Sequence, residues 1–503
     1  MNSIRSLNAV AVAFQRQIRT KYPRNPMQTQ MIATLCLITF LLVPPVRAVD
    51  LIAIATVSGT YQDFATETAG LLESGISGNR LGGIGSGLAY AGGNTFLALP
   101  DRGPNAIPFN SLVDDTISYI PRVHTFNLSL APSFDPATGL PFTLTPMLLD
   151  TMLLSSPSPL VYSSGAGLGF QIDGVTPIGS GAPALNAVNH TFYFSGRSDN
   201  FDPTSPSANP NNARLDAEGI RVSNNGKFVF ISDEYGPYVY AFNRSTGKRV
   251  RSYALPENLA VNYQSAHGDS EINVTNNPVG RIANKGMEGL AITPDGSMLV
   301  GIMQANLEQD AKGNLRIVTI AVGSGESHEY AYKLTDGSGV SEIVAVNNHQ
   351  FLTDERDGAG LGDKPLLTDT ATQAKFKKLY LIDLDGATDV KEVFALPSPQ
   401  VVPVAKTPFL DIVSKLTAAG MDARLIPAKL EGVAFGQDVV IGGEIRHTLY
   451  VANDNDFQAT VADPLKLPAD TTRGLVLNPN KFFVFAFSDS ELPGYIPQQI
   501  QLP

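Results

Sequence analysis

Short apolar runs separated by polar turn residues dominate the chain. From Glu218 the segments EGIRVS, KFVFIS, YVYAFN and RVRSYAL follow one another closely. Runs of this length, rich in β-branched and aromatic residues and bounded by Gly, Asn and Asp, predict β-strands. The Asn-Gly pair in the turn SNNG predicts a tight hairpin between the first two runs. This stretch is therefore expected to form a four-stranded antiparallel unit.

The same four-strand pattern returns along the chain. Copies begin at Glu288, Ser341 and Glu431, and an earlier copy reads GGIGSGLAYAGGNTFLALPDRGPN. Repeated four-stranded units are typical of β-propeller blades. A further blade is expected in 151–217, where HTFYFSGRSDN supplies one strand. The expected fold is all-β, a propeller of roughly six or seven four-stranded blades with long inter-strand loops.

Two other segments add to this picture. The opening run LIAIATVS is expected to close the ring by pairing with the last blade. The segment 408–420, PFLDIVSKLTAAG, has apolar residues at helical spacing and is the best candidate helix.

The first 48 residues read as a targeting segment. Basic residues precede the first acid, Asp50, and are followed by the apolar run MIATLCLITFLLV and then PPVRA. This order predicts a secretory signal peptide, 1–48, cleaved after Ala48, and a single mature domain, 49–503. The apolar run is short for a membrane span, so no stable membrane insertion is expected after removal, although a long basic region leaves an uncleaved anchor open. We expect a secreted protein, periplasmic or extracellular, without thiols, since Cys36 lies in the signal.

Acidic residues outnumber basic ones. The net charge of −11 argues against a nucleic-acid-binding surface and is compatible with cation binding. Histidines are scattered without ligand spacing, and no G-x-S-x-G nucleophile motif occurs. The expected partner is a small-molecule ester, and the expected state is a monomer.

The acids recur at equivalent places in the repeats. In a propeller the first strand of each blade lines the central channel, so acids that open the blades and acids that end the second strands share one face. Oxygen-only clusters suit hard cations, above all calcium, although the same acids also suit turns and strand ends. The predicted catalytic acids are Glu218, Glu288 and Glu431, and the predicted metal ligands are Asp101, Asp233, Glu234, Glu355 and Asp454.

Three arginines lie beside these acids. Arg102, Arg197 and Arg356 end PDR, SGR and DER, respectively. An arginine fork matches phosphate or carboxylate, and it also pairs with a neighbouring aspartate. Three of them at equivalent blade positions are predicted to bind an anionic substrate beside the metal. The strand after Glu288 ends in Met303-Gln304 instead of an acid pair, so that position is expected outside a metal ring.

The motifs LDAEGIRVSNNGKFVFISDEYGPYVYAFN, NKGMEGLAITPDG, FLTDERDG and KLEGVAF, taken together, resemble the phytase-like (esterase-like activity of phytase) family of secreted bacterial proteins. The resemblance runs from about residue 75 to 490. It implies a propeller that hydrolyses phosphate esters with calcium, by attack of water. Two alternatives stay open: a calcium-dependent carboxylic esterase or lactonase, and a non-catalytic binding propeller at the cell surface.

Overall fold

The structure is a computed structural model. It describes residues 49–105, 110–170, 174–175, 177–178, 181–272, 275–363, 372–465 and 474–501. Residues 49–503 form one compact unit. The predicted signal peptide lies outside the described residues.

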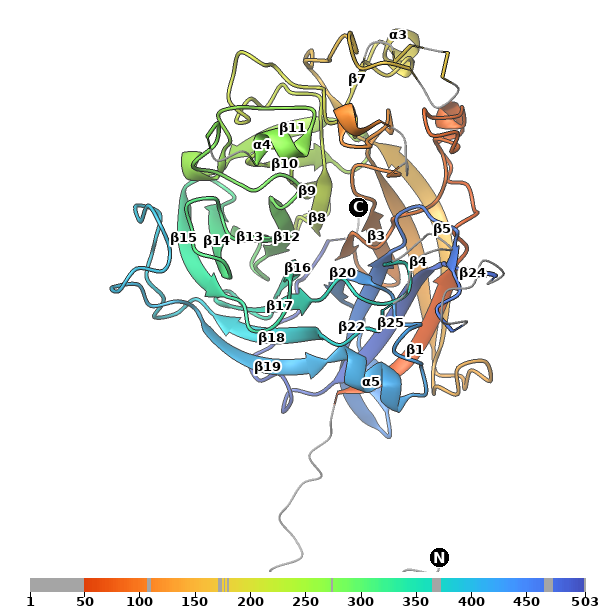
Figure 1. The fold of residues 1–503 in the computed structure, drawn as a ribbon. Coiled ribbons are helices and arrows are strands. Elements are labelled where there is room, and N and C mark those ends of the chain that lie inside the picture. The colour runs from red at the N-terminus through yellow and green to blue at the C-terminus, as the bar shows by residue number, and fades with distance from the viewer. Residues whose placement is uncertain are drawn as a thin grey trace, which may run out of the picture. The chain divides into compact units, whose positions relative to one another are not determined.

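Five antiparallel sheets, each with a path of four strands, make up this unit (Figure 1). Their innermost strands contact one another in a closed cycle, β2–β8–β12–β16–β20–β2. The first blade consists of β2 (Gly87–Tyr90), β3 (Thr95–Leu99), β4 (Arg122–Ala131) and β5 (Thr143–Leu153), and the second of β8 (Ala217–Val222), β9 (Phe228–Asp233), β10 (Tyr238–Asn243) and β11 (Arg249–Ala254). The third consists of β12 (Met287–Ile292), β13 (Met298–Met303), β14 (Asn314–Ala321) and β15 (Ser327–Lys333), and the fourth of β16 (Gly339–Ala345), β17 (Gln350–Arg356), β18 (Lys377–Asp383) and β19 (Ala405–Asp411). The fifth consists of β20 (Lys429–Phe435), β22 (Glu444–Asp454), β25 (Asn480–Phe487) and β1 (Asp50–Val57). The predicted all-β propeller is confirmed.

The predicted number of six or seven blades is wrong, because the structure has five. Within its described residues, the segment 151–217, expected to form another blade, contains only the end of β5, the two-residue strands β6 (Ser155–Ser156) and β7 (Phe192–Tyr193) and the short helix α3 (Leu185–Asn189) before β8 begins at Ala217. Proline, glycine and serine interrupt it repeatedly, as in SSPSPL and DPTSPSANPNN. Such residues favour turns over ladder pairing, so the segment forms loops beside the ring.

The ring closes through the two ends of the described unit. β1 pairs antiparallel with β25, with Ala53 opposite Val484, so the N-terminal strand completes the fifth blade (Figure 1). This confirms the predicted pairing of the opening run with the last blade. A short strand, β21 (Val439–Ile441), also pairs with β22 in this blade.

The remaining elements are short. They are the hairpin β23 (Thr460–Ala462) and β24 (Leu475–Leu477), the helices α4 (Gly268–Glu271) and α5 (Ile412–Ala418), and the 3-10 turns η1 (Thr66–Thr68), η2 (Ser111–Val113) and η3 (Glu257–Leu259). The predicted helix over 408–420 is confirmed in its central part. It starts later than expected because Asp411 caps it, with its side chain accepting the backbone N–H of Ser414, and because β19 extends to that residue. Within the described part of the chain, no helix has the length and apolar character needed to cross a membrane.

Hydrophobic clusters fill the space between neighbouring blades. Along β25 the side chains alternate between two of these clusters: Phe482 and Val484 pack towards the first blade, and Phe483 and Phe485 towards the fourth. Both faces of such a strand are buried, which explains its nearly continuous apolar sequence.

Glycines let the inner strands approach one another closely. Gly219, Gly289 and Gly432 each follow an acid on an inner strand. A Cβ atom built on Gly289 would lie 2.8 Å from the Cα of Glu342, and one on Gly432 would lie 2.9 Å from the carbonyl oxygen of Gly85. The glycines of the Glu-Gly pairs therefore allow neighbouring inner strands to pack closely, whether or not the adjacent acids form a site.

Replacing Gly289 with alanine is expected to lower the free energy of unfolding by about 1–3 kcal/mol, because the added methyl group meets the backbone of the neighbouring blade. Denaturant titration measures this loss. Gly323→Ala is the matched control, since nothing lies within 4 Å of the corresponding Cβ position. Equal stability of the two variants would contradict the close approach.

The Arg221 side chain connects several of the inner strands. Its guanidinium donates to the carbonyl oxygens of Leu88 (2.7 Å), Ile343 (2.8 Å) and Val433 (3.3 Å), which belong to three other inner strands. It also forms an ion pair with Glu342 at 3.1 Å. One buried cation therefore ties four of the five inner strands together.

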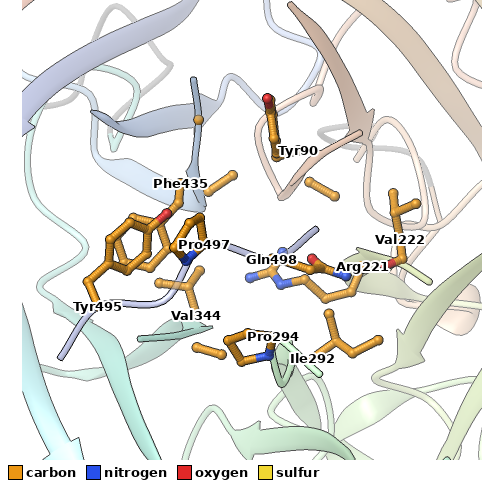
Figure 2. Close-up of a pocket in the computed structure, with 14 residues that line it drawn as sticks. Tyr90, Arg221, Val222, Ile292, Pro294, Val344, Phe435, Tyr495, Pro497 and Gln498 are labelled. Carbon is orange, nitrogen blue, oxygen red and sulfur yellow. Dashed lines mark hydrogen bonds between the residues drawn. The ribbon is translucent and has the colours of Figure 1, made fainter. Parts of the chain in front are cut away.

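The C-terminal segment covers the channel on the Arg221 side. Figure 2 shows Gln498 beside Arg221, and Pro497 and Tyr495 farther from it, around a pocket at the ends of the inner strands. The Gln498 side-chain amide donates to the carbonyl oxygen of Val222 at 2.8 Å, on the second blade. The backbone N–H of Ile496 donates to the carbonyl oxygen of Val346 in the fourth blade, also at 2.8 Å. The C-terminal segment therefore packs against the ends of the inner strands on the Arg221 side.

Candidate functional site

A polar cavity of about 100 Å³ lies where residues from all five blades converge. Six carboxylates, three basic side chains and three amides line it. They are Asp101, Asp216, Glu218, Glu234, Glu288 and Glu431; Arg102, Arg356 and Lys429; and Asn105, Asn284 and Gln304.

The first hairpin of the second blade brings Glu218 and Glu234 together. The SNNG turn is closed by a bond from the N–H of Gly226 to the carbonyl oxygen of Ser223 at 2.8 Å, with Gly226 at a φ of +69°. Ala217 then pairs with Asp233 at the other end of the hairpin. The residues that follow these two, Glu218 and Glu234, therefore lie at the same end, as the sequence predicts.

Each acid on an inner strand coincides with an irregularity in the pairing of that strand. The register shifts between Ala217 and Ile220, which spans Glu218, and between Leu430 and Val433, which spans Glu431. It also shifts beside Glu288 and Glu342. A bulge changes the direction of a side chain, so this irregularity directs the acids towards the axis.

Glu218, Glu234 and Glu288 form a buried carboxylate group, which we call the carboxylate trio. One oxygen from each lies within 4.8 Å of the others. Glu234 accepts the backbone N–H of Gly286 at 3.0 Å, whereas Oε2 of Glu288 has no hydrogen-bond partner. Among the described residues, no basic side chain forms an ion pair with any member of the trio.

Burial and mutual repulsion raise the pKa of each member of the trio. The pKa of Glu288 rises to about 8, mainly through burial and then through the charge of Glu431. Burial and the charge of Glu288 raise the pKa of both Glu218 and Glu234 well above the ordinary value. A cation among these oxygens would remove the repulsion that drives these shifts.

A second carboxylate group shares Glu218. Oxygens of Asp101, Asp216 and Glu218 lie within 4.8 Å of one another, and those of Asp101, Asp454 and Asp456 do so as well. The ammonium group of Lys429 lies against the last of these groups, 2.8 Å from Asp454 and 2.5 Å from Asp456.

The basic side chains of the cavity all have acidic partners. Arg102 pairs with Asp216 at 3.1 Å, and Arg356 pairs with Glu431 and donates to the Ser341 hydroxyl at 2.6 Å. Because these basic groups are already paired with other acids, none of them forms an ion pair with the trio.

Four residues predicted for the site do not line the cavity, and each has partners of its own. Arg197, predicted to bind substrate, donates two hydrogen bonds to the carboxylate of Asp199. Asp233, predicted to bind metal, accepts the backbone N–H groups of Asp216 and Tyr235.

Glu355, also a predicted ligand, accepts from the Tyr332 hydroxyl at 2.6 Å and pairs with Lys406. Side chains alternate along a strand, so Glu355 points away from the face on which its neighbours Asp354 and Arg356 lie. Asp454 does not line the cavity itself and bonds Lys429 beside it.

Four lining residues were not predicted. Asp216 precedes the Glu-Gly pair by two residues in LDAEG, a signal that was available in the sequence. Gln304, expected outside a metal ring, also lines the cavity, as do Asn105 and Asn284. No sequence pattern distinguishes the loop residues Asn105 and Asn284 from ordinary turn residues.

Comparisons with known proteins found one similar curated sequence. A secreted protein of Arthroderma benhamiae, itself uncharacterized, is 30% identical over 259 residues, which make up 46% of this chain and 46% of that protein. This chain therefore matches about half the length of that relative.

Two solved structures are similar over much of the chain. The Pseudomonas aeruginosa periplasmic gluconolactonase PpgL is 12% identical, with 86% of this chain and 98% of that chain covered and a TM-score of 0.30. The Kuenenia stuttgartiensis hydrazine synthase is 10% identical, with 75% and 78% covered and a TM-score of 0.28.

The model of a family described as Phytase-like, esterase-like activity of phytase, matches residues 79–457. That span contains all five inner strands and every residue that lines the cavity. Because the match covers most of the chain, the protein belongs to the Phytase-like family, as its motifs indicated.

Proposed function

We propose that the cavity is the active site of a cation-dependent hydrolase that cleaves phosphate esters. One observation carries this proposal: the carboxylate trio is buried, has no basic partner within the described structure and leaves an oxygen of Glu288 without a hydrogen bond. A buried charge of this kind is costly unless a cation compensates it. Membership in the Phytase-like family supports hydrolysis as the activity.

Calcium is the cation that fits these residues best. All the candidate ligands are carboxylate oxygens, and neither histidine nor cysteine lines the cavity. Hard oxygen donors in this number suit calcium. Glu218, Glu234 and Glu288 would hold it, with Asp101 and Asp216 beside them. When bound, calcium would polarise the phosphoryl group.

The other charged residues of the cavity have distinct tasks in this proposal. Glu431 belongs to none of the three carboxylate groups, and it accepts the proton of the attacking water. Arg356 orients Glu431 through their ion pair. Lys429, fixed by Asp454 and Asp456, adds positive charge near the phosphate oxygens.

We propose secretion of a monomeric enzyme that acts on a small ester. The Arthroderma benhamiae relative is a secreted protein, and the predicted signal peptide agrees with this.

Phosphate release by the purified mature chain is expected with calcium and is expected to disappear with a chelator. Phytate, simple monoesters and diesters are the substrates to compare, with carboxylic esters and lactones in parallel. Release of phosphate only with calcium supports the proposal. Calcium-dependent turnover of carboxylic esters alone would replace it with an esterase. Stabilisation by calcium without any turnover would indicate a binding propeller.

A further inference from the structure

The guanidinium of Arg102 donates hydrogen bonds to other residues of the protein. Its Nη1 donates to Asp216 and to Oδ1 of Asn284, and its Nη2 donates to Oδ1 of Asn105 at 3.3 Å. The backbone N–H of Arg102 donates to the other oxygen of Asp216 at 3.0 Å, which fixes the start of the side chain. Its fork is thus largely occupied and is not free to bind a substrate anion bidentately.

The arginine in turn orients two amides. Because the carbonyl ends of Asn105 and Asn284 accept from Arg102, the amino ends must be their Nδ2 groups on the opposite side. Neither Nδ2 group has a partner within the described residues, and both asparagines line the cavity. Each amide therefore keeps two N–H donors unused.

Asn284 adopts a backbone conformation that few residue types accept. Its φ is +55°, in the left-handed region that asparagine tolerates better than most residues. Non-glycine residues in this region cluster at functional sites. Nε of Arg102 is also buried without a hydrogen-bond partner. Arg102, Asn105 and Asn284 together thus hold unused donors around one side of the cavity.

We propose that Asn105 and Asn284 are the residues that bind the substrate's anionic oxygens, and that Arg102 is a positioning residue that holds both amides with their N–H groups available. The ligand class is a phosphate group, whose oxygens accept hydrogen bonds and carry charge. This inference rests on the proposed function, and it replaces direct anion binding by Arg102 with recognition by the amides. The carboxylate trio binds the cation, and the amides bind the anion on the same cavity wall as Asp216.

Binding of inorganic phosphate to the full mature chain, in the presence of calcium, tests this by calorimetry. Asn284→Asp keeps the oxygen that bonds Arg102 and tolerates the positive φ, but it removes the donors. Asn105→Asp does the same at the second position, and Asn105→Leu removes the donors without adding charge. Each variant is expected to weaken phosphate binding about tenfold, the effect of losing one hydrogen bond to a charged group. Calcium affinity is expected to stay at the wild-type value in Asn105→Leu, and Tm is expected to fall only slightly, because the variant also removes the acceptor of the 3.3 Å bond from Arg102.

Kinetics give a second readout. The variants are expected to raise KM for a phosphate monoester more than they lower kcat, whereas a general loss of structure would lower Tm and calcium affinity as well. Asn314→Asp is the matched control, because it makes the same chemical change outside the cavity and is expected to bind phosphate normally.

The outcomes separate this inference from the function on which it rests. Wild-type phosphate affinity in Asn105→Leu, or no binding of phosphate to the wild-type protein with calcium, overturns the role of the amides. Failure of calcium to bind the wild-type protein overturns the proposed function, whatever the variants do with phosphate.

Discussion

Replacing Glu218 with glutamine is expected to abolish the rise in Tm that calcium causes and to lower phosphate release about 100-fold or more. Glu218 belongs to two of the buried carboxylate groups, the trio among them, so its carboxylate lies close to those of four other acids. Glutamine has the same shape but donates on one side and carries no charge. Calorimetric unfolding with and without calcium, together with the phosphate assay, measures both effects.

The variant is not expected to unfold in the absence of calcium. Burial and neighbouring acids raise the pKa of Glu218 well above its ordinary value, so its charge opposes folding and the neutral amide removes that cost. Glu355→Gln is the matched control: it removes a buried predicted ligand that pairs with Lys406 outside the cavity. It should lower stability and keep the calcium response. A normal calcium response in Glu218→Gln would refute the cation site.

Arg221→Met is expected to lower the free energy of unfolding by about 3–5 kcal/mol at neutral pH. The change leaves the Glu342 carboxylate buried without its ion pair and removes the donors for carbonyl groups on three other strands. Urea titration measures the loss. The double variant Arg221→Met/Glu342→Gln should recover part of it, because no unpaired charge is left.

The loss in Arg221→Met should also depend on pH. Burial raises the pKa of Glu342 to about 7 even with Arg221 beside it, and removal of the arginine raises it further. A carboxyl group with a raised pKa in the folded state contributes stability at low pH, below its unfolded pKa, and this is lost as pH rises through the folded pKa. The variant should therefore be closer to the wild type at pH 5 than at pH 8. A loss independent of pH would show that the carbonyl contacts matter and the charge does not.

The hairpin pattern was sufficient to predict the blades and the meeting of Glu218 with Glu234. Turn chemistry such as SNNG is local, and it sets the register of two strands without help from the rest of the chain. The pairing of the opening run with the last blade was also predictable, because a propeller needs its ring closed. The number of blades was not, because 151–217 contains enough apolar residues for a strand but too many interruptions for a sheet.

The composition of the cavity was predictable only in part. Repeated acids indicated an acidic channel, and the structure brings Glu218, Glu288 and Glu431 into one cavity with Asp101, Glu234, Arg102 and Arg356. Whether an acid at the end of a strand points to the axis depends on one-residue shifts in register. Such a shift directs Glu355 to Tyr332 and Lys406, while the adjacent Arg356 reaches the cavity. Whether a loop residue such as Asn105 reaches the cavity depends on how distant segments of the chain pack, and a local sequence pattern does not contain that information.

The closure of the ring by β1 and β25 has a consequence for biogenesis. The two strands come from opposite ends of the chain, with Asp50 opposite Ala486. Since a polypeptide is made from its N-terminus, β1 is synthesised before the other strands of the five blades, and its partner β25 is synthesised after them. Until β25 is made, β1 is an unpaired, largely apolar strand and the fifth blade is incomplete. β1 is therefore the segment that a chaperone would need to shield while the other blades form.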